Sequence, residues 1–494
     1  MDRLCYETLE KQGYKGYLLK AAPERVLQFG EGNFLRAFVD HFIDIMNERT
    51  GFNGKVVAVT PRGTGKHWNV LNTQEGLYTL LLRGREKGRR VDDKRILSCI
   101  SRCINPYEDH NEFLRCAANP DLRFIVSNTT EAGIVYDPLC KVTDEPASSF
   151  PGKLTRFLYE RFKNGLSGFI ILSCELIDRN GDELLNCVEK YARLWELPEE
   201  FSEWIRKENT FCSTLVDRIV PGFPKEEAEK IWEELGYRDD LLDAGEIFAS
   251  WVIEGPKTIL DEFPADKAGL PITITDNVDP YKKRKVRILN GAHTSMVLAA
   301  FLAGRDIVRE CMEDDCIRGY MKTALYEEII PVLKGLDQKE LKEFGEAVFD
   351  RFANPFIDHE LLSIALNSTA KWKARVMPSL LEYYEQKGYL PKILTFSYAA
   401  YLSFYHCGRV LEAGVLKGER NGREFLIKDD EWVLKEFLRL RDAGALELVG
   451  AITDNEKMWG DSLGKLPGFK ETVTDDLKLI TDMGMYEAMR KILE

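Results

Sequence analysis

ERVLQFGEGNFLRAF, residues 24 to 38, is the stretch of sequence that decides the fold. An apolar run ends at Gly30, a second glycine follows at Gly32, and an amphipathic segment begins directly afterwards. A buried strand that passes through a glycine-rich turn into a helix creates an anion-binding helix N-terminus. The stretch therefore predicts the first strand and the phosphate-binding turn of a parallel α/β sheet.

Three more apolar runs follow in the first half of the chain: KVVAVT (55 to 60), RFIVSNT (123 to 129) and GFIILSCEL (168 to 176). The apolar residues of each run are followed by Thr, Asn or Ser. Amphipathic segments separate these runs, and NFLRAFVDHFIDIMNE (33 to 48) is expected to be a single helix. Strands that alternate with helices are typical of a parallel sheet with crossover helices. The first half is therefore predicted to be an α/β domain of the Rossmann type.

The pattern of the chain changes after the four apolar runs. Segments 197 to 208 and 224 to 237 are expected to be surface helices inserted after the sheet strands, and the tract 271 to 287, with two prolines and a basic cluster, is expected to connect two domains. Beyond this tract the periodicity is helical and strand-like runs are scarce. We expect a Rossmann-type domain with insertions over residues 1–282, followed by an all-helical substrate and catalytic domain over residues 283–494.

Length and charge limit the classes of function. At 494 residues the chain exceeds the size of one hydrophobic core, and its net charge of −13 disfavours nucleic acid or anionic membranes as partners. The eleven cysteines form no C-x-x-C pair, and neither a signal peptide nor a membrane-spanning run is visible. A cytoplasmic monomer or homodimer that acts on a small molecule is expected. If that molecule is an anion, its pocket must contain Lys or Arg.

The glycine turn suggests a dinucleotide. Gly30 permits the tight turn and Gly32 allows the backbone to approach a pyrophosphate, so Gly30, Gly32, Asn33 and Phe34 are candidate cofactor contacts. The third glycine of G-x-G-x-x-G is missing, because Leu35 occupies its place. A plain turn between a strand and a helix is the alternative interpretation.

Two later loops bear on the same cofactor. The second strand ends without the acidic residue that usually binds the ribose of NAD, and Arg62 is present instead, so the residues leave NAD and NADP both open. GTGK (63 to 66) lacks the rest of a P-loop. SNTTEAG follows the third of the four runs, and Asn128, Thr129, Thr130 and Glu131 are expected to face the cofactor unless they only cap a loop; these four residues lie at 128 to 131.

Lys285, Asn290 and His293 are the candidate catalytic residues. On an α-helix they would lie at roughly 0°, 140° and 80° around the axis, which is one broad face. Oxidation of an alcohol needs a base for the hydroxyl proton and donors for the oxygen. Lys285 is the candidate base, Asn290 is the candidate donor to the oxygen, and His293 is expected to orient the substrate. A solvated lysine and a core histidine are the bland alternatives. With six histidines and no H-E-x-x-H spacing, no metal site is expected.

K-x4-N-x2-H after a G-x-G-x-F-x-R turn resembles the polyol-specific long-chain dehydrogenases, the mannitol dehydrogenase family. The resemblance extends over almost the whole chain through NTQEGLYTLLLRG, FPGKLTRFLYERF, TLVDRIVPG, EIFASWVIEG and NPFIDHELLSIALNSTAKWKARVMP. It implies a metal-independent dehydrogenase that prefers NAD to NADP, with Lys285 as general base beside Asn290 and His293. It also implies that Asp217 and Arg218 line the substrate site, although a buried structural pair is the alternative.

Two departures from the family pattern point to a charged substrate. Mannitol-type members carry S-C-D-N where this chain has Ser173-Cys174-Glu175-Leu176, and they carry an arginine where this chain has Ser363. The resemblance is greatest to members that act on sugar acids, so a carboxylate partner is expected among His359, Lys371 and Arg375. The alternative functions are a dehydrogenase for a different hexuronate, a dehydrogenase for a neutral polyol such as mannitol or arabinitol, and an inactive NAD-binding sensor.

Overall fold

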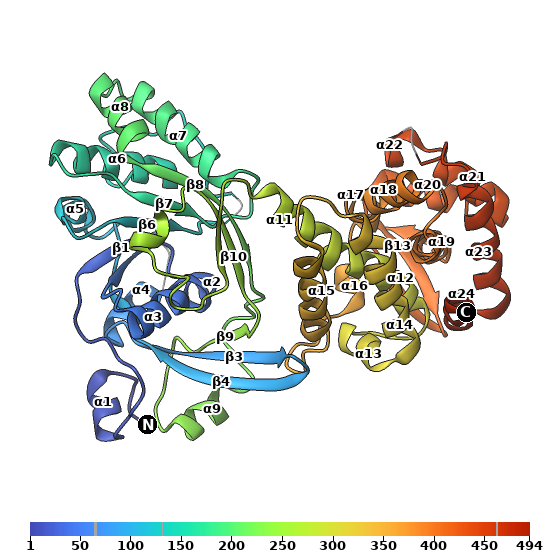
Figure 1. The fold of residues 1–494 in the computed structure, drawn as a ribbon, viewed down its shortest axis with the longest axis horizontal. Helices are drawn as coiled ribbons and strands as arrows, with labels where there is room; N and C mark the ends of the chain where they lie inside the picture. Colours follow the sequence, from blue (N-terminus) through green and yellow to red (C-terminus); the bar gives the residue numbers. More distant parts are fainter. Residues whose placement is uncertain (64–66, 131, 461–462) are drawn as a thin grey trace. The chain divides into compact units, whose positions relative to one another are not determined.

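A computed structural model describes residues 1–63, 67–130, 132–460 and 463–494, which form two compact units (Figure 1). The first unit contains residues 1–83 and 91–278, and the second contains residues 84–90 and 279–494. The division after Val278 lies inside the tract 271 to 287, which carries two prolines and a basic cluster.

An eight-stranded sheet forms the centre of the first unit. Each strand runs parallel to its neighbours, except that β10 runs antiparallel to β8. The spatial order is β11 (Ile272–Thr275), β10 (Ser250–Glu254), β8 (Thr210–Asp217), β7 (Ile170–Ser173), β6 (Phe124–Ser127), β1 (Glu24–Phe29), β2 (Lys55–Val59) and β5 (Ile100–Ile104). The four apolar runs are the adjacent strands β7, β6, β1 and β2, so the predicted Rossmann-type sheet is confirmed.

Both faces of this sheet are buried, which explains why its strands read as continuous apolar runs. In β2, Val56 packs into one hydrophobic cluster and Val57 into the other, since successive side chains point to opposite faces. The first cluster includes Phe42 of α3, and the second includes Leu154 of α6 and Val188 of α7. The helices of this unit are α1 (Tyr6–Lys11), α2 (Asn33–Ala37), α3 (Val39–Thr50), α4 (His67–Thr73), α5 (His110–Arg115), η1 (Cys116–Ala118), α6 (Phe150–Lys163), α7 (Asn180–Leu194), α8 (Glu199–Glu208), α9 (Ala228–Leu235) and α10 (Ile259–Glu262).

Two sequence expectations differ from the structure in this unit. The segment 33 to 48 is not one helix, because Phe38 has φ −122° and ψ −76° and separates α2 from α3. The connecting tract also contributes β11 to the sheet edge. A smaller sheet, in the order β4 (Arg89–Leu97), β3 (Tyr78–Glu86) and β9 (Asp243–Glu246), was not expected as a separate element.

The second unit is built around α12 and α19, which pack against each other, and α19 also packs against α23. Figure 1 shows the other helices of this unit grouped around them. Its helices are α11 (Asp279–Arg284), η2 (Lys285–Asn290), α12 (Gly291–Leu302), α13 (Val308–Glu313), α14 (Asp315–Thr323), η3 (Ala324–Ile329), η4 (Ile330–Val332), α15 (Gln338–Phe352), α16 (Leu361–Ile364), α17 (Ser368–Arg375), α18 (Met377–Lys387), α19 (Lys392–His406), α20 (Glu431–Arg439), α21 (Ala445–Thr453), α22 (Glu456–Trp459), α23 (Phe469–Met483) and α24 (Met485–Leu493).

The expectation of a helix-rich second domain is confirmed, but the expectation that it is all-helical is wrong in one place. Residues 410–427 form a three-stranded sheet of β12 (Val410–Glu412), β13 (Val415–Arg420) and β14 (Arg423–Ile427). Ala413–Gly414 and Asn421–Gly422 connect the strands, and all four residues have positive φ. Asn-Gly between short strands is a strong hairpin signal, and it was visible in the sequence.

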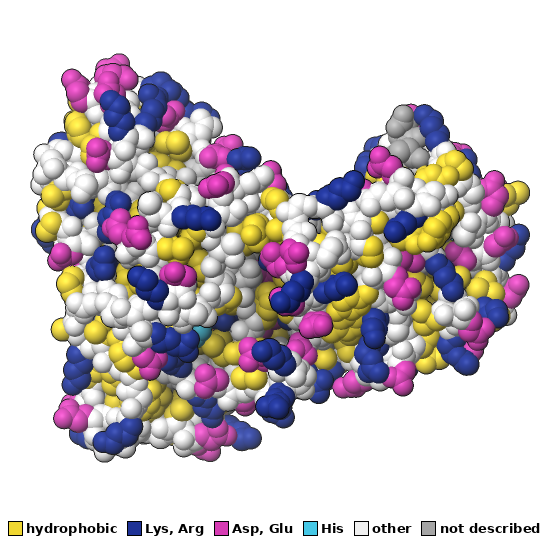
Figure 2. Space-filling view, viewed as in Figure 1, with side chains coloured by type: hydrophobic (Ala, Val, Ile, Leu, Met, Phe, Trp, Pro, Cys, Tyr) yellow, Lys and Arg dark blue, Asp and Glu magenta, His cyan; other side chains and the backbone are white. Residues whose placement is uncertain are grey.

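Two further properties of the molecule are the distribution of charged side chains on its surface and the length and polarity of its helices. In the face drawn in Figure 2, acidic and basic side chains are interspersed over both units. Within the described residues, no helix is long and apolar enough to cross a membrane.

Candidate active site

The turn after β1 has the geometry that the sequence predicts for a glycine-rich turn. Gly30 has φ +128°, and a Cβ atom there would lie 3.2 Å from the carbonyl oxygen of Asn128 and 2.8 Å from Leu35 Cδ1. Both its conformation and the close approach of the next loop therefore require glycine. Gly32 precedes α2, and a Cβ atom there would have nothing within 4 Å, so the space beside its backbone is open.

Arg36 holds this turn in place. Its guanidinium donates to Asn33 Oδ1 and to the carbonyl oxygen of Leu241, each at 2.6 Å, and its side chain is buried. Phe34 stacks on Phe38 with a centroid distance of 5.0 Å. Arg36 is the arginine of the G-x-G-x-F-x-R motif, so the motif itself was the signal that could have identified it as a positioning residue.

The loop after β6 lies beside this turn. Asn128 donates from Nδ2 to the carbonyl oxygen of Cys174 at 2.9 Å, which connects the loop to the end of β7. Thr130 is exposed with φ +75°, and its hydroxyl lies 3.4 Å from Nη2 of Arg62, which is also exposed. Glu131, a candidate cofactor contact, lies outside the described residues, as do positions 64–66 of GTGK.

Glu175, which follows β7, also binds the loop after β6. It was not among the candidate site residues. Its Oε1 accepts hydrogen bonds from the backbone N–H and the hydroxyl of Thr129, and its Oε2 accepts one from the hydroxyl of Ser127. Burial raises the pKa of the Glu175 carboxyl, while the hydrogen bonds from Thr129 oppose that rise. The S-C-E-L departure thus places a buried acceptor at the carboxyl edge of the sheet.

Arg218, at the end of β8, has its donors occupied within the first unit. The guanidinium donates to the carbonyl oxygens of Ala37 at 2.6 Å, Phe248 at 3.1 Å and Ile247 at 3.3 Å. Its side chain is buried, and burial lowers the pKa of Arg218 to about 10. These contacts favour a structural role for Arg218 over a role in substrate binding. Its neighbour Asp217 is also buried.

Lys285 and Asn290 are the first and last residues of a π-helical turn, η2. A π-helix pairs residue i with residue i+5, so it has more residues per turn than an α-helix, and residues five apart lie nearly one above the other. The α-helical estimate of roughly 140° between these two side chains is therefore wrong, because it assumed an α-helix. Both residues are half-buried, and His293 follows in the first turn of α12.

His293 is held between two rings. Its imidazole stacks on Phe352 with a centroid distance of 3.7 Å and an interplanar angle of 4°, and it meets His359 edge to face at 5.6 Å. Nε2 is enclosed and has no hydrogen-bond partner among the described residues. Burial, followed by the charges of His359 and Arg351, holds the pKa of His293 well below its usual value. The ring is therefore neutral at physiological pH.

Lys371 and Arg375, one turn apart on α17, place two positive charges close to the imidazole of His293, and burial lowers the pKa of His359 as well. Lys371 donates to the carbonyl oxygen of Ile364 at 2.8 Å, and burial and then the charge of Arg375 lower its pKa. Burial also lowers the pKa of Arg375, which has no ion pair in the part of the chain that the structure describes. A structural ion pair, the alternative explanation for Arg375, is therefore not observed there.

Gly291 explains how these distant segments come together. A Cβ atom at Gly291 would lie 3.2 Å from the carbonyl oxygen of Arg375, so the end of α17 packs directly against the start of α12. Ser363, the second departure from the polyol pattern, is exposed, and its hydroxyl lies 3.3 Å from Glu360 Oε2. No group of three or more His, Cys, Asp or Glu residues within the described ranges is arranged to hold a metal ion.

Comparison with known proteins identifies the family. A model of the mannitol dehydrogenase Rossmann domain matches residues 24–266, and a model of the mannitol dehydrogenase C-terminal domain matches residues 277–481. The chain belongs to the mannitol dehydrogenase family. It is therefore an oxidoreductase, and the resemblance that its motifs suggest is confirmed.

Relatives within the mannitol dehydrogenase family match over nearly the full length. The chain is 47% identical over 497 residues to the altronate oxidoreductases of Shigella flexneri and Escherichia coli O139:H28 (strain E24377A / ETEC), covering 98% of this chain and 100% of each relative. A substrate-free D-sorbitol dehydrogenase structure is similar in fold, with a TM-score of 0.81, 22% identity and coverage of 99% and 100% of the two chains. The Pseudomonas fluorescens mannitol 2-dehydrogenase in complex with NAD and D-mannitol has a TM-score of 0.67, 21% identity and coverage of 99% of both chains.

Proposed function

We propose that this chain is an NAD-dependent oxidoreductase that interconverts D-tagaturonate and D-altronate. The observation that carries the proposal is the pair of cations beside His293, Lys371 and Arg375, of which Arg375 has no ion pair among the described residues. A carboxylate is the ligand that satisfies a half-buried guanidinium best, because the two can form paired hydrogen bonds. The 47% identity to altronate oxidoreductases over nearly the whole chain supports the same substrate.

The second unit supplies the groups that handle the proton and the reacting oxygen. Lys285 acts as the general base that removes the hydroxyl proton of altronate, and in the reverse direction its ammonium returns that proton. The side-chain amide of Asn290 and an N–H of neutral His293 donate hydrogen bonds to the oxygen. Arg375, assisted by Lys371 and His359, holds the carboxylate and so orients the sugar acid.

The first unit fits a dinucleotide. Gly30, Gly32, Asn33 and Phe34 form the turn that would hold its pyrophosphate, and the open space beside Gly32 is what a close backbone approach requires. NAD held by this turn would supply the acceptor for the hydride of the substrate carbon.

The loops beside the turn complete the proposed cofactor site. Asn128, Thr129 and Thr130 would contact the dinucleotide from the end of β6, where Glu175 fixes Thr129. NAD is assigned in preference to NADP, and the exposed Arg62 is not used to hold a 2′-phosphate.

Purified protein mixed with NADH and D-tagaturonate tests the proposal through the fall in absorbance at 340 nm. D-Fructuronate and D-fructose are the matched comparisons, since the first keeps the carboxylate and the second is a neutral ketose. We expect the highest kcat/KM with tagaturonate. Faster reduction of fructuronate would move the assignment to that sugar acid, and faster reduction of fructose would reject a sugar-acid enzyme. No oxidation of NADH with any of the three would support a sensor instead.

A further inference from the structure

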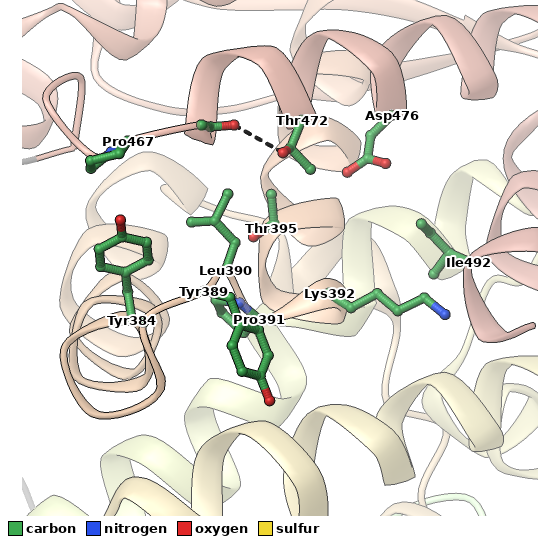
Figure 3. A pocket seen from close by; sticks show the side chains of 12 residues that line it. Tyr384, Tyr389, Leu390, Pro391, Lys392, Thr395, Pro467, Thr472, Asp476 and Ile492 are labelled. Atoms are coloured by element: carbon green, nitrogen blue, oxygen red, sulfur yellow. Dashed lines mark hydrogen bonds between the residues drawn. The ribbon is translucent and has the colours of Figure 1, made fainter.

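A pocket of about 570 Å³ lies within the second unit, away from Lys285, Asn290 and His293. It is formed by the end of α18, the start of α19, and parts of α23 and α24 (Figure 3). Its volume is in the range of cavities that hold small organic molecules. None of the candidate catalytic or cofactor residues lines it.

Two buried polar atoms in this pocket have no partner. Asp476 of α23 has 7% of its surface exposed and Thr395 of α19 has 0%, and neither Asp476 Oδ2 nor Thr395 Oγ1 has a hydrogen-bond partner among the described residues. Both side chains line the pocket and are drawn facing it in Figure 3. Buried polar atoms are almost always paired, so an unpaired carboxyl oxygen and an unpaired hydroxyl at one pocket indicate a missing partner, and the carboxyl oxygen requires that partner to be a donor.

Charge and shape narrow the chemistry of that donor. Burial and, to a smaller extent, the negative charge of neighbouring Asp475 raise the pKa of Asp476 to about 7. No ion pair to Asp476 is found in the described ranges. Lys392 extends along the rim towards Ile492, and its charge acts on Glu494. The remaining walls include the ring of Tyr384 and the apolar side chains of Leu390, Pro391 and Pro467. A carboxyl group inside apolar walls favours a cation that carries an apolar body.

We propose that this pocket binds a small organic amine. The ammonium group donates hydrogen bonds to Oδ2 of Asp476 and Oγ1 of Thr395, while the carbon skeleton packs against Tyr384 and Leu390. Recognition is of an ammonium ion, because a carboxylate without a cationic partner gains more from a charged donor than from a neutral one. The inference does not depend on the proposed reaction, since no residue of the pocket takes part in it.

Titration calorimetry of the full-length protein with phenethylamine tests the proposal. 2-Phenylethanol is the matched uncharged ligand, because it differs from phenethylamine only in the donor group. We expect one binding site for the amine and at least tenfold weaker binding of the alcohol. Equal affinity for both compounds, or no binding of the amine at millimolar concentration, would overturn the proposal.

Asp476→Asn and Asp475→Asn are a matched pair of variants, because each removes one negative charge from adjacent positions of α23, and only Asp476 is buried. Asp476→Asn should weaken phenethylamine binding by about 10- to 100-fold, whereas Asp475→Asn should change it about twofold or less. The amine should raise the melting temperature of the wild type and of Asp475→Asn but not of Asp476→Asn. Equal losses in both variants would show a general effect of charge and reject the site. The melting temperature of ligand-free Asp476→Asn reports whether the variant is folded.

Discussion

Glu175 accepts hydrogen bonds from both the backbone N–H and the hydroxyl of Thr129, each at 3.0 Å. One buried carboxyl thereby fixes the loop after β6 to the end of β7, at the carboxyl edge where a Rossmann-type sheet binds its ligand. The polyol-type members have Asp-Asn where this chain has Glu175-Leu176. The longer acidic side chain reaches across to the neighbouring loop, while Leu176 is exposed.

Replacement of Glu175 should loosen the cofactor loop. Glu175→Leu leaves the buried N–H of Thr129 without an acceptor, which costs about 1–3 kcal/mol. We expect NADH to bind about tenfold more weakly and the melting temperature to fall, with a smaller effect in Glu175→Gln, which keeps one acceptor oxygen. Fluorescence titration with NADH measures the affinity. Glu183→Leu, at an exposed position of α7, is the control, and an unchanged NADH affinity in Glu175→Leu would exclude this role.

Loss of the base should remove turnover and spare cofactor binding. In Lys285→Ala we expect kcat to fall by about 10²- to 10⁴-fold while the dissociation constant of NADH stays near that of the wild type. Lys283→Ala is the matched control two residues away, because Lys283 pairs with Glu382 at 3.0 Å and the Arg287–Glu382 pair remains without it. Stopped-flow absorbance at 340 nm measures the rate. A turnover number in Lys285→Ala similar to that in Lys283→Ala would reject the assignment.

The carboxylate partner should be revealed by a substrate-dependent effect on KM. Arg375→Ala should raise KM for tagaturonate by about 10- to 100-fold, since a hydrogen bond to a charged group contributes roughly 1.5–3 kcal/mol. KM for fructose should change much less, because fructose has no carboxylate. Lys373→Ala, on the same helix, serves as the control. If both substrates lose affinity equally, Arg375 supports the fold and does not bind the carboxylate.

His293 should not titrate in the neutral range. Burial and the surrounding positive charges hold its pKa well below the usual value, so the ring stays neutral between pH 6 and 8. Proton NMR spectra recorded across that interval should contain imidazole signals of both His293 and His41 that do not move, because burial holds the pKa of His41 well below its usual value too. The protein has six histidines, and the missing signal in His293→Gln assigns that of His293. A midpoint near 6.5 for that signal would contradict the neutral ring.

Asp40 should make stability depend on pH. Burial raises its pKa to about 7, against about 3.9 for an unfolded chain, so the folded protein holds a proton that the unfolded protein has already lost. Stability from this group therefore decreases as pH rises from about 4 to 7 and is fully lost above that interval. Asp40→Asn should raise the melting temperature at pH 8 more than at pH 5, since the amide can still accept from Gln28 and Tyr78. Asp93→Asn, an exposed change, should shift it equally at both pH values, and the opposite ranking for Asp40→Asn would reject this explanation.

Local patterns were enough to identify four of the eight strands of the central sheet and the glycine turn. The strands β1, β2, β6 and β7 are buried on both faces, so each is a short apolar run that a sequence displays directly. The hairpins of β12 to β14 were missed although Asn421–Gly422 marks one of them, because neighbouring helical periodicity was extended across a short segment.

The sequence by itself determined the four central strands, the glycine turn and the grouping of Lys285, Asn290 and His293, because each depends on residues close together in the chain. Tertiary structure decided what surrounds them. The π-helical turn changes which side chains align, and Gly291 allows α17 to bring Arg375 against the start of α12. Contacts between residues far apart in the chain depend on packing and buried charge. A local sequence pattern therefore does not predict them.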